Sequence, residues 1–244
     1  MKLLIKFNLV LLVVFGAGLA VTGYLTNQVL QENAKREVLS DASLMMEAAM
    51  AARSYTATEI KPLLAARLNE EFLPQSVPSY AATESFSKLH ESYKNYSYRE
   101  ATLNPTSPRD RVVEWEADVV RHLRDHPELK EMVGERATPA GPSLYLARPI
   151  QIKDAQCLTC HSTPAAAPAT MRALYGDANG FGWKLNEIVG SQIVSVPLEV
   201  PLKQAAHAYN LIMGAMLATF AGTLLVVNLA FYVLVLRPMR RITR

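Results

Sequence analysis

The sequence predicts an α+β domain with an antiparallel sheet, joined to two hydrophobic helices. Three observations support this prediction: uncharged apolar stretches near both ends, a long glycine-free stretch after the first of them, and two short segments late in the chain with aromatic or β-branched content. Strands that follow a long helix, rather than alternating with helices, are typical of α+β folds. With 50% hydrophobic residues and two cysteines among 244, the composition excludes a disordered, fibrous or disulfide-stapled protein.

Residues 7–25 and 209–236 are expected to cross a membrane as helices. Both stretches are uncharged, and at about 1.5 Å per residue each can span a hydrocarbon core of about 30 Å. The alternative for the first stretch is a cleaved signal peptide, because residues 16–20 are small. Its apolar run is longer than the usual signal core of about 7–15 residues, which favours an uncleaved anchor.

The flanking charges predict the orientation of both spans. All the lysines and arginines outside the central segment lie at the two ends of the chain: Lys2, Lys6, Arg237, Arg240, Arg241 and Arg244. Because such flanks stay in the cytoplasm, we expect residues 1–6 and 237–244 to be cytoplasmic. Residues 26–208 then form a periplasmic domain at the bacterial inner membrane. This domain is mildly acidic, which argues against a nucleic-acid partner.

Two helices are expected in the domain. Residues 26–72 contain no glycine and a single proline, which predicts a long helix that continues from the first span and breaks or bends near Pro62. A second helix is expected over residues 112–131, where apolar residues such as Trp115 and Val119 recur every four positions.

The remaining segments predict strands and turns. Residues 74–108 contain four prolines and are expected to form turns and extended pieces. Strands are predicted over residues 143–152 and 188–198, which have the length and the aromatic or β-branched content of strands. These two strands are the expected basis of the antiparallel sheet.

The motif Cys157-Leu158-Thr159-Cys160-His161 is the attachment signature of a c-type haem. Two thiols at this spacing can each form a thioether to one vinyl group of a porphyrin, and the adjacent His161 can ligate the iron. Both cysteines of the chain belong to this motif. The motif therefore predicts one covalently bound haem c per chain.

Three other interpretations of the motif are weaker. A local disulfide or a redox dithiol would use the two cysteines, but neither needs the histidine, and no thioredoxin-like βαβ pattern surrounds the motif. A zinc site requires four ligands, and the chain has no second cysteine pair. A periplasmic location also favours haem attachment.

The sixth iron ligand is left open by the sequence. A thioether would raise the reduction potential relative to a second histidine. The candidates are Met45, Met46, Met50, Met132, Met171, His90, His122, His126 and His207. A methionine of the first helix is the preferred sixth ligand, although core packing is the commoner role of methionine. The alternative is an iron whose sixth coordination position is open.

Several further segments carry a resemblance to a known family: residues 55–56, 60–64, 77–82, 100–110, 144–150, 157–164, 175–176, 180–183 and 187–197. Together they extend over about residues 40–200. They resemble the Tll-type DUF3365 family, a periplasmic c-type haem domain with a PAS-like fold. The resemblance implies an α+β, PAS-like antiparallel sheet with a long N-terminal helix, of the kind that heads membrane-bound sensor kinases and chemoreceptors.

The resemblance also implies the binding residues. Cys157, Cys160 and His161 are carried over as haem-binding residues. The family's distal ligand, where it is a cysteine, comes from the first long helix, and this chain has no third cysteine. The neighbourhood of Met50 and Arg53 must then supply another ligand or leave the iron open.

Further polar residues have expected roles near the haem. Arg53 and Tyr55 are the expected distal-pocket groups, with a surface ion pair and a packed aromatic as alternatives. Asn104, Arg109 and Asp110 are expected either to hold haem propionates or to order a turn.

Two functions follow from these expectations. The first is a redox or gas-sensing input module, supported by residues 236–242, which resemble the start of a HAMP linker. It calls for a cytoplasmic signalling partner and, by analogy with two-span receptors, a homodimer. The second is a tethered cytochrome that passes electrons to a respiratory or photosynthetic complex. No HExxH or GxSxG motif occurs, so we do not expect an enzyme.

Overall fold

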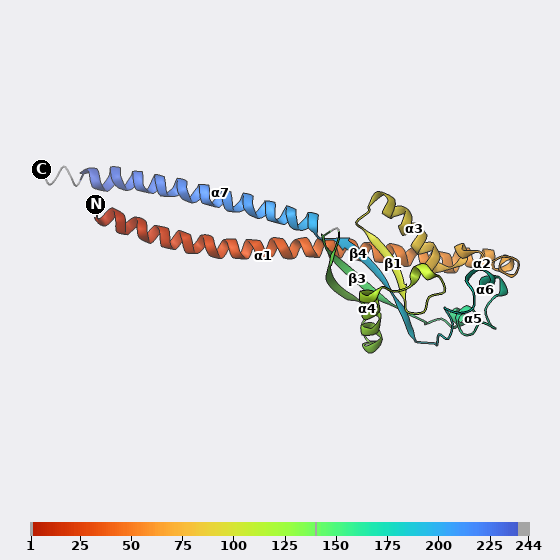
Figure 1. Cartoon of the computed structure of the whole chain (residues 1–244). Coiled ribbons are helices and arrows are strands. Elements are labelled where there is room, and N and C mark those ends of the chain that lie inside the picture. Colours follow the sequence, from red (N-terminus) through yellow and green to blue (C-terminus); the bar gives the residue numbers. More distant parts are fainter. Residues whose placement is uncertain (1, 140, 239–244) are drawn as a thin grey trace. The chain divides into compact units, whose positions relative to one another are not determined.

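The computed structural model describes residues 2–139 and 141–238, and their contacts separate into two units. One unit contains the residues up to 36 together with those from 200 onward, and the other contains residues 37–199. Helix α1 (Lys2–Tyr55) begins in the first unit and ends in the second (Figure 1). Of the predicted tail at 237–244, only residues 237 and 238 are among those described.

The first unit pairs the start of α1 with α7 (Glu199–Phe231), which ends in the π-helical turn η6 (Tyr232–Leu236). Both α1 and α7 are long and apolar enough to cross a membrane. Phe7 stacks on Phe231 with ring centroids 5.3 Å apart. Phe15 lies 4.9 Å from Phe220. Since the partner number falls as the residue number rises, the two helices run antiparallel.

A pair of asparagines joins the same two helices. The Asn8 amide nitrogen donates to the Asn228 side-chain oxygen at 2.8 Å, and Asn228 donates back to Asn8 at 2.7 Å. Each amide also donates to the carbonyl four residues earlier in its own helix. These polar side chains therefore satisfy one another within apolar segments.

In the second unit, α1 presents one apolar stripe to the domain. Its buried residues recur every three or four positions: Val38, Ala42, Met46 and Ala49. After Tyr55 the winding changes to the π-helix η1 (Thr56–Ile60), then to α2 (Lys61–Leu64) and the 3-10 turn η2 (Ala65–Asn69). Pro62 lacks the N–H that would continue the α-helical ladder, so the disruption expected near Pro62 is confirmed.

The sheet has four antiparallel strands in the order β1-β4-β3-β2. The strands are β1 (Ser97–Thr102), β2 (Met132–Thr138), β3 (Gly141–Gln151) and β4 (Ile188–Pro197). The predicted strands at 143–152 and 188–198 are confirmed as β3 and β4. The expected class, an α+β fold with a long N-terminal helix and an antiparallel sheet, is also confirmed.

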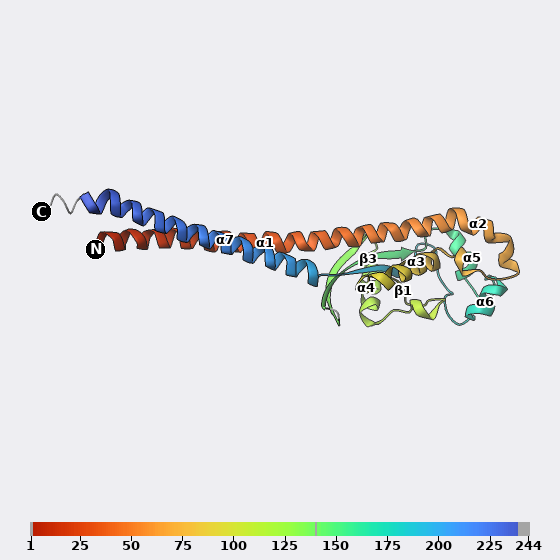
Figure 2. The same cartoon turned by 90° about the horizontal axis from the view of Figure 1, so that it is seen from above.

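Two different layers cover the two faces of this sheet (Figures 1 and 2). On one face, α4 (Glu114–Asp125) packs on a core of sheet and helix residues. That core consists of Ala101, Val119, Leu123, Tyr145, Ala147 and Ile193. On the other face, α1 reaches the sheet through the Arg53–Glu100 and Glu47–Arg148 ion pairs. Strand β4 lies between β1 and β3, and nine of its ten residues are buried.

The expectation for residues 74–108 is wrong in part. The stretch contains the short turns η3 (Pro74–Ser76) and η4 (Pro108–Asp110), but also α3 (Pro78–Ser92) and strand β1. Pro78 is the first residue of α3, where its missing N–H would have no intrahelical partner in any case. A proline at that position starts a helix rather than breaking one.

The second predicted helix, at 112–131, is shorter than expected. Helix α4 begins at Glu114, and the Glu116 carboxylate accepts the Val113 N–H at 2.9 Å, which caps the first turn. The helix ends at Asp125, and β2 follows from Met132.

Candidate functional site

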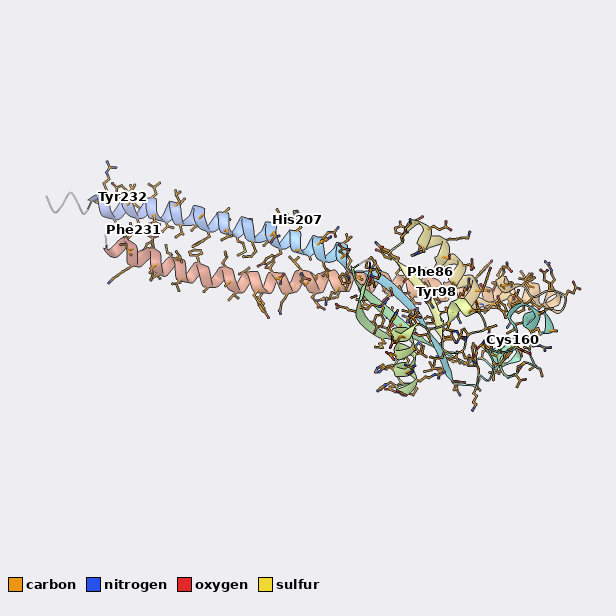
Figure 3. The ribbon with its side chains drawn as sticks, viewed as in Figure 1. Phe86, Tyr98, Cys160, His207, Phe231 and Tyr232 are labelled. Carbon is orange, nitrogen blue, oxygen red and sulfur yellow. The ribbon has the colours of Figure 1, made fainter. Side chains whose placement is uncertain are left out.

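The cysteine–histidine motif occupies a short helical segment that follows β3. Cys157 ends the 3-10 turn η5 (Ala155–Cys157), and Cys160 and His161 lie in the one-turn helix α5 (Leu158–His161). The Asp154 carboxylate accepts the Gln156 N–H at 2.8 Å and caps this segment. Both cysteines are free and partly exposed; Cys160 is labelled in Figure 3. Neither cysteine is tied up in a disulfide, as covalent attachment of a haem requires.

His161 is oriented by a loop from a distant part of the chain. Its Nδ1 lies 2.7 Å from the carbonyl oxygen of Gly180 and 3.5 Å from Oγ1 of Thr106. A carbonyl oxygen only accepts hydrogen bonds, so Nδ1 carries the proton in the 2.7 Å contact. The other ring nitrogen, Nε2, then keeps its lone pair for a metal, which is the usual arrangement of a ligating histidine.

Trp183 packs against the same histidine ring. The two ring centroids are 3.9 Å apart and the ring planes are 16° from parallel. The backbone N–H of Trp183 also donates to the His161 carbonyl at 3.2 Å. Burial lowers the pKa of His161, and the bond to Gly180 opposes this shift. The imidazole is therefore neutral at neutral pH, as metal ligation requires.

Gly180 and Asn104 fix the loop that carries this carbonyl. The Asn104 side chain accepts the Gly180 N–H at 3.2 Å and donates to the Phe181 carbonyl at 3.1 Å. Gly180 has φ +83°, and a Cβ built on it would lie 2.0 Å from Oγ1 of Thr106. Only glycine fits this position. Of the two roles expected for Asn104, the structure supports the ordering of a turn.

Several charged residues affect the pKa of the Cys157 thiol. Burial raises the pKa of the Cys157 thiol and Asp154 adds to this shift, while Lys61 and Arg53 act in the opposite direction. The Arg53 guanidinium forms an ion pair with Glu100 on β1. The Arg53 guanidinium is therefore held by a carboxylate.

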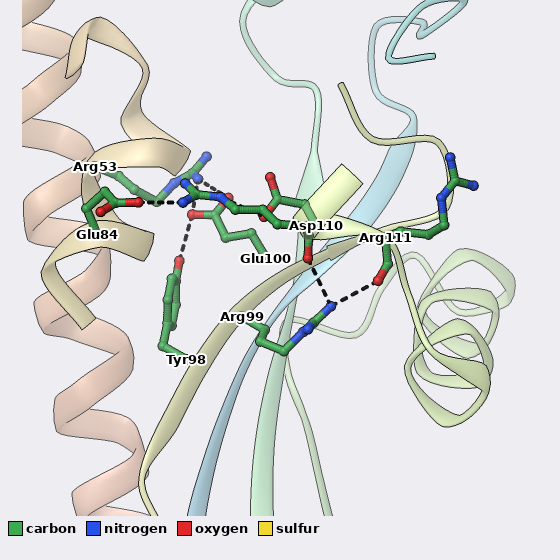
Figure 4. A network of polar contacts seen from close by, with 8 residues as sticks. Arg53, Glu84, Tyr98, Arg99, Glu100, Asp110 and Arg111 are labelled. Atoms are coloured by element: carbon green, nitrogen blue, oxygen red, sulfur yellow. Dashed lines mark hydrogen bonds and ion pairs between the residues drawn. The ribbon is translucent and has the colours of Figure 1, made fainter. Parts of the chain in front are cut away.

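Glu100 is the centre of a buried polar network (Figure 4). Its side chain is 4% exposed, and it accepts a hydrogen bond from the Tyr98 hydroxyl at 2.8 Å. The Gln192 amide donates to the same Tyr98 oxygen at 3.2 Å. Burial is the largest cause that raises the pKa of Tyr98, and the Glu100 charge raises it further, so the phenol stays protonated and remains a donor.

A second cluster of charges lies beside the first. Arg109 pairs with Glu84 on α3 and with Asp110 at 3.7 Å, and its guanidinium lies 4.9 Å from the centre of the Tyr80 ring. Burial raises the pKa of Asp110 to about 6, and Glu100 contributes in the same direction. Arg109, a candidate for holding propionates, is thus engaged with protein groups.

The methionine candidates are placed in different environments. Met50 is 40% exposed on α1, one helical turn before Arg53. Met46 and Met171 are buried, and Met132 packs against the core beneath α4. The other predicted residue of this helix, Tyr55, is 60% exposed, so it lies off the buried stripe of α1.

The histidine candidates have partners of their own or lie in the other unit. His90 Nδ1 is 2.8 Å from the Tyr96 carbonyl. His122 and His126 are exposed on α4 with ring centroids 4.4 Å apart, and His207 belongs to α7. Among the described residues, no cluster of three or more His, Cys, Asp and Glu side chains could hold a metal ion.

Sequence reasoning missed the partners of His161 and the anchor of Arg53. In the sequence, Gly180 and Trp183 stand out only as part of a family-like segment, although two glycines spaced by one residue are a signal of an unusual backbone. Glu100 and Tyr98 give no signal of their own, because β1 itself is not predicted.

The donor set fits a c-type haem. Two free, partly exposed cysteines precede a neutral histidine whose Nδ1 proton is committed to a backbone carbonyl, which is what attachment and axial ligation require. Cys157, Cys160 and His161 are the residues that could hold the group.

Comparison with known proteins gives a consistent result. The sequence model of the Tll0287-like family (Tll0287) matches residues 31–197. The fold resembles the crystal structure of the cyanobacterial heme-protein Tll0287, with a TM-score of 0.50, 14% sequence identity, and coverage of 66% of this chain and 95% of that chain. No curated protein sequence matches the chain. The family match covers more than half of the sequence, and the chain therefore belongs to the Tll0287-like family.

Proposed function

We propose that the domain of residues 37–199 binds one haem c, through thioethers from Cys157 and Cys160 and through the Nε2 atom of His161. The observation that carries this proposal is the 2.7 Å contact between His161 Nδ1 and the Gly180 carbonyl, which leaves Nε2 available. The heme-protein named in the structural comparison supports it.

Attachment requires only the two thiols and the vinyl groups of haem. Each thiol adds its sulfur and its hydrogen across one vinyl double bond, so no oxidant or reductant is consumed. When bound, haem supplies an iron that can exchange one electron or bind a diatomic gas. The chain contributes the neutral imidazole of His161, and Trp183 and Gly180 hold that ring in place.

We propose Met50 as the distal ligand, with Arg53 and Tyr55 as its neighbours on α1. Met50 is exposed enough to move toward a bound cofactor, and a thioether is a known axial ligand. A Met50→Leu variant tests this assignment, because loss of a thioether changes the absorption spectrum of a six-coordinate haem. An unchanged spectrum would leave the sixth position to water or to an exogenous ligand.

We further propose that the domain is periplasmic and PAS-like, and that α1 and α7 anchor it in the inner membrane with both termini in the cytoplasm. The basic residues beside the two apolar stretches support this orientation. Both ends of the domain then connect directly to a membrane helix.

We propose a non-enzymatic role as the redox or gas-sensing input of a signalling protein. The segment that contacts His161 leads into β4, the inner strand of the sheet, and a single residue, Leu198, separates β4 from α7. A change in the haem site that moves β4 would therefore move the start of α7. The expected partners are a second copy of the chain and a cytoplasmic signalling protein.

Electron transfer is the second candidate function. The partial exposure of Cys157 and Cys160 favours it, since an attached porphyrin would have an edge near the surface. The two functions differ in gas binding. Rapid electron exchange with a soluble donor, together with no binding of CO or NO, would refute gas sensing and favour the cytochrome.

The experiment that tests the haem proposal uses the full chain produced with its attachment machinery. Pyridine-hemochrome spectra and intact mass should show one haem per chain in the wild type. Cys157→Ala and Cys160→Ala should each keep one thioether and lower the haem yield, and His161→Ala should lose the normal ligand spectrum. His90→Ala is the matched control, because the His90 Nδ1 lies 2.8 Å from the Tyr96 carbonyl, in a part of the chain outside the motif. A wild-type chain without a covalent haem would refute the proposal.

A further inference from the structure

The Arg53–Glu100 pair is an unusual feature to find beside the candidate haem motif. Glu100 is 4% exposed and Arg53 is 23% exposed, so both charges are largely removed from water. A buried ion pair is weak as a source of stability, because the cost of desolvation offsets most of the attraction. Ionisable groups with perturbed pKa values cluster at functional sites, so a buried ion pair at such a site is a candidate for a functional role.

The carboxylate of the pair is held in a fixed place. Tyr98 donates to Glu100 at 2.8 Å, and Gln192, the residue opposite Glu100 on β4, donates to the Tyr98 oxygen. The ring of Tyr98 is in turn packed against Phe86 of α3, with centroids 4.9 Å apart, and both residues are labelled in Figure 3. Side chains locked in this way keep their charges at a constant position.

Both members of the pair belong to elements that lead to the motif. Arg53 belongs to the last turn of α1, and its charge acts on the Cys157 thiol. Glu100 interacts with Arg53 and with Asp110. Glu100 itself lies on β1, and the loop that follows this strand contains Thr106, whose Oγ1 lies 3.5 Å from His161 Nδ1.

We propose that Arg53 and Glu100 are positioning residues that set the reduction potential of the haem bound at Cys157, Cys160 and His161. This inference rests on the proposed haem binding. A positive charge near the iron favours the reduced state, which carries one charge less, and a negative charge favours the oxidised state. Because the pair is held together, its two contributions largely cancel, and a change in either charge shifts the balance.

The test is a spectroelectrochemical titration of the full haem-loaded chain and its variants. Glu100→Gln removes the negative charge and should raise the potential. Arg53→Gln removes the positive charge and should lower the potential. In the double variant both charges are gone, and the potential should return close to that of the wild type.

Two controls separate charge from packing. Arg53→Lys keeps the charge and should keep the potential much closer to the wild-type value than Arg53→Gln does, so this comparison decides the matter if Glu100→Gln does not fold. Arg121→Gln breaks an exposed pair with Asp118 on α4, where the side chains are 62% and 70% exposed, and should leave the potential unchanged.

The outcomes distinguish this inference from the proposed function. Opposite shifts in the two single variants that cancel in the double variant support it. Haem present in every variant, with shifts of the same sign or no shift, would overturn the role of the pair and leave haem binding intact. No haem in the wild-type chain would overturn both.

Discussion

Replacing Gly180 by alanine should damage the site more than the same change two residues later. Gly180 and Gly182 both have φ +83°, which costs an L-residue about 1–2 kcal/mol. The two positions differ in their surroundings. A Cβ at Gly180 would lie 2.0 Å from Oγ1 and 2.8 Å from the backbone Cα of Thr106, whereas a Cβ at Gly182 meets nothing within 4 Å. Gly182→Ala is therefore a matched control for backbone strain alone.

The additional cost at Gly180 can be estimated from this overlap. Forcing a methyl group into a packed position typically costs about 1–3 kcal/mol, and the Thr106 backbone atom cannot rotate away. Near the melting temperature, about 2 kcal/mol corresponds to a shift of about 4–8 °C for a domain of this size. We expect Gly180→Ala to melt lower than Gly182→Ala by about this amount, as measured by circular dichroism.

A second change tests the cause. Thr106→Ala in the Gly180→Ala background removes the Oγ1 overlap at 2.0 Å but leaves the overlap with the backbone at 2.8 Å, so it should restore only part of the loss. The haem spectrum should change with Gly180→Ala, because the Gly180 carbonyl orients His161. Equal melting temperatures for the two alanine variants, or no coupling between positions 106 and 180, would refute this reasoning.

Three further changes have defined outcomes. Glu116→Ala removes the cap on the Val113 N–H from a buried position and should lower the free energy of unfolding by about 2 kcal/mol in chemical denaturation. The pKa of Asp110 is raised to about 6, so between about pH 4 and pH 6 the folded protein holds a proton on Asp110 that the unfolded chain has lost. The free energy of unfolding should therefore fall as the pH rises through this range. Asp110→Asn should remove this pH dependence. Asn8→Leu leaves the Asn228 amide without its partner on α1 and should destabilise the full chain in detergent by about 0.6–2 kcal/mol, while the double leucine variant should recover part of this loss.

Each of these changes has a control within the chain. Glu114→Ala alters an exposed carboxylate in the same helical turn as Glu116 and should leave the melting temperature within error. Asp125→Asn removes an exposed carboxylate and should keep the pH slope. Thr219→Val removes a hydroxyl that donates within α7 to the Ala215 carbonyl at 2.9 Å, and should not match the loss at Asn8. A control that behaves like its test variant would contradict the corresponding assignment.

The parts of the fold with local apolar signals were predictable. Strand β4 is rich in β-branched residues and β3 in leucine and tyrosine, and both lie at nearly the expected residues. Strand β1 has the sequence SYREAT, whose two charged residues give no indication that most of the strand is buried. Glu100 is buried because Arg53 of α1 neutralises it, and the neighbouring Arg99 pairs with the buried Glu116 of α4. No pattern within the strand itself records those partners.

The residues of the candidate site also differ in whether the sequence predicts them. Cys157, Cys160 and His161 lie within five residues, so the motif is visible in the sequence. The groups that orient His161 come from two loops far away, and Asn104, Thr106 and Gly180 meet only in the folded domain. The sequence places Met50 and Tyr55 on one helix without revealing which face of it is buried, and both residues are substantially exposed.

The stack of Trp183 on His161 gives the protein an internal optical reporter. The chain has two tryptophans, and the other, Trp115, lies on α4 beneath the Arg136 guanidinium and beside Tyr145. A porphyrin held by His161 absorbs where indole emits, and Trp183 would be in contact with its axial ligand. Emission from Trp183 should therefore be extinguished as the cofactor is loaded, so that ultraviolet fluorescence follows maturation of the protein in real time without any added dye.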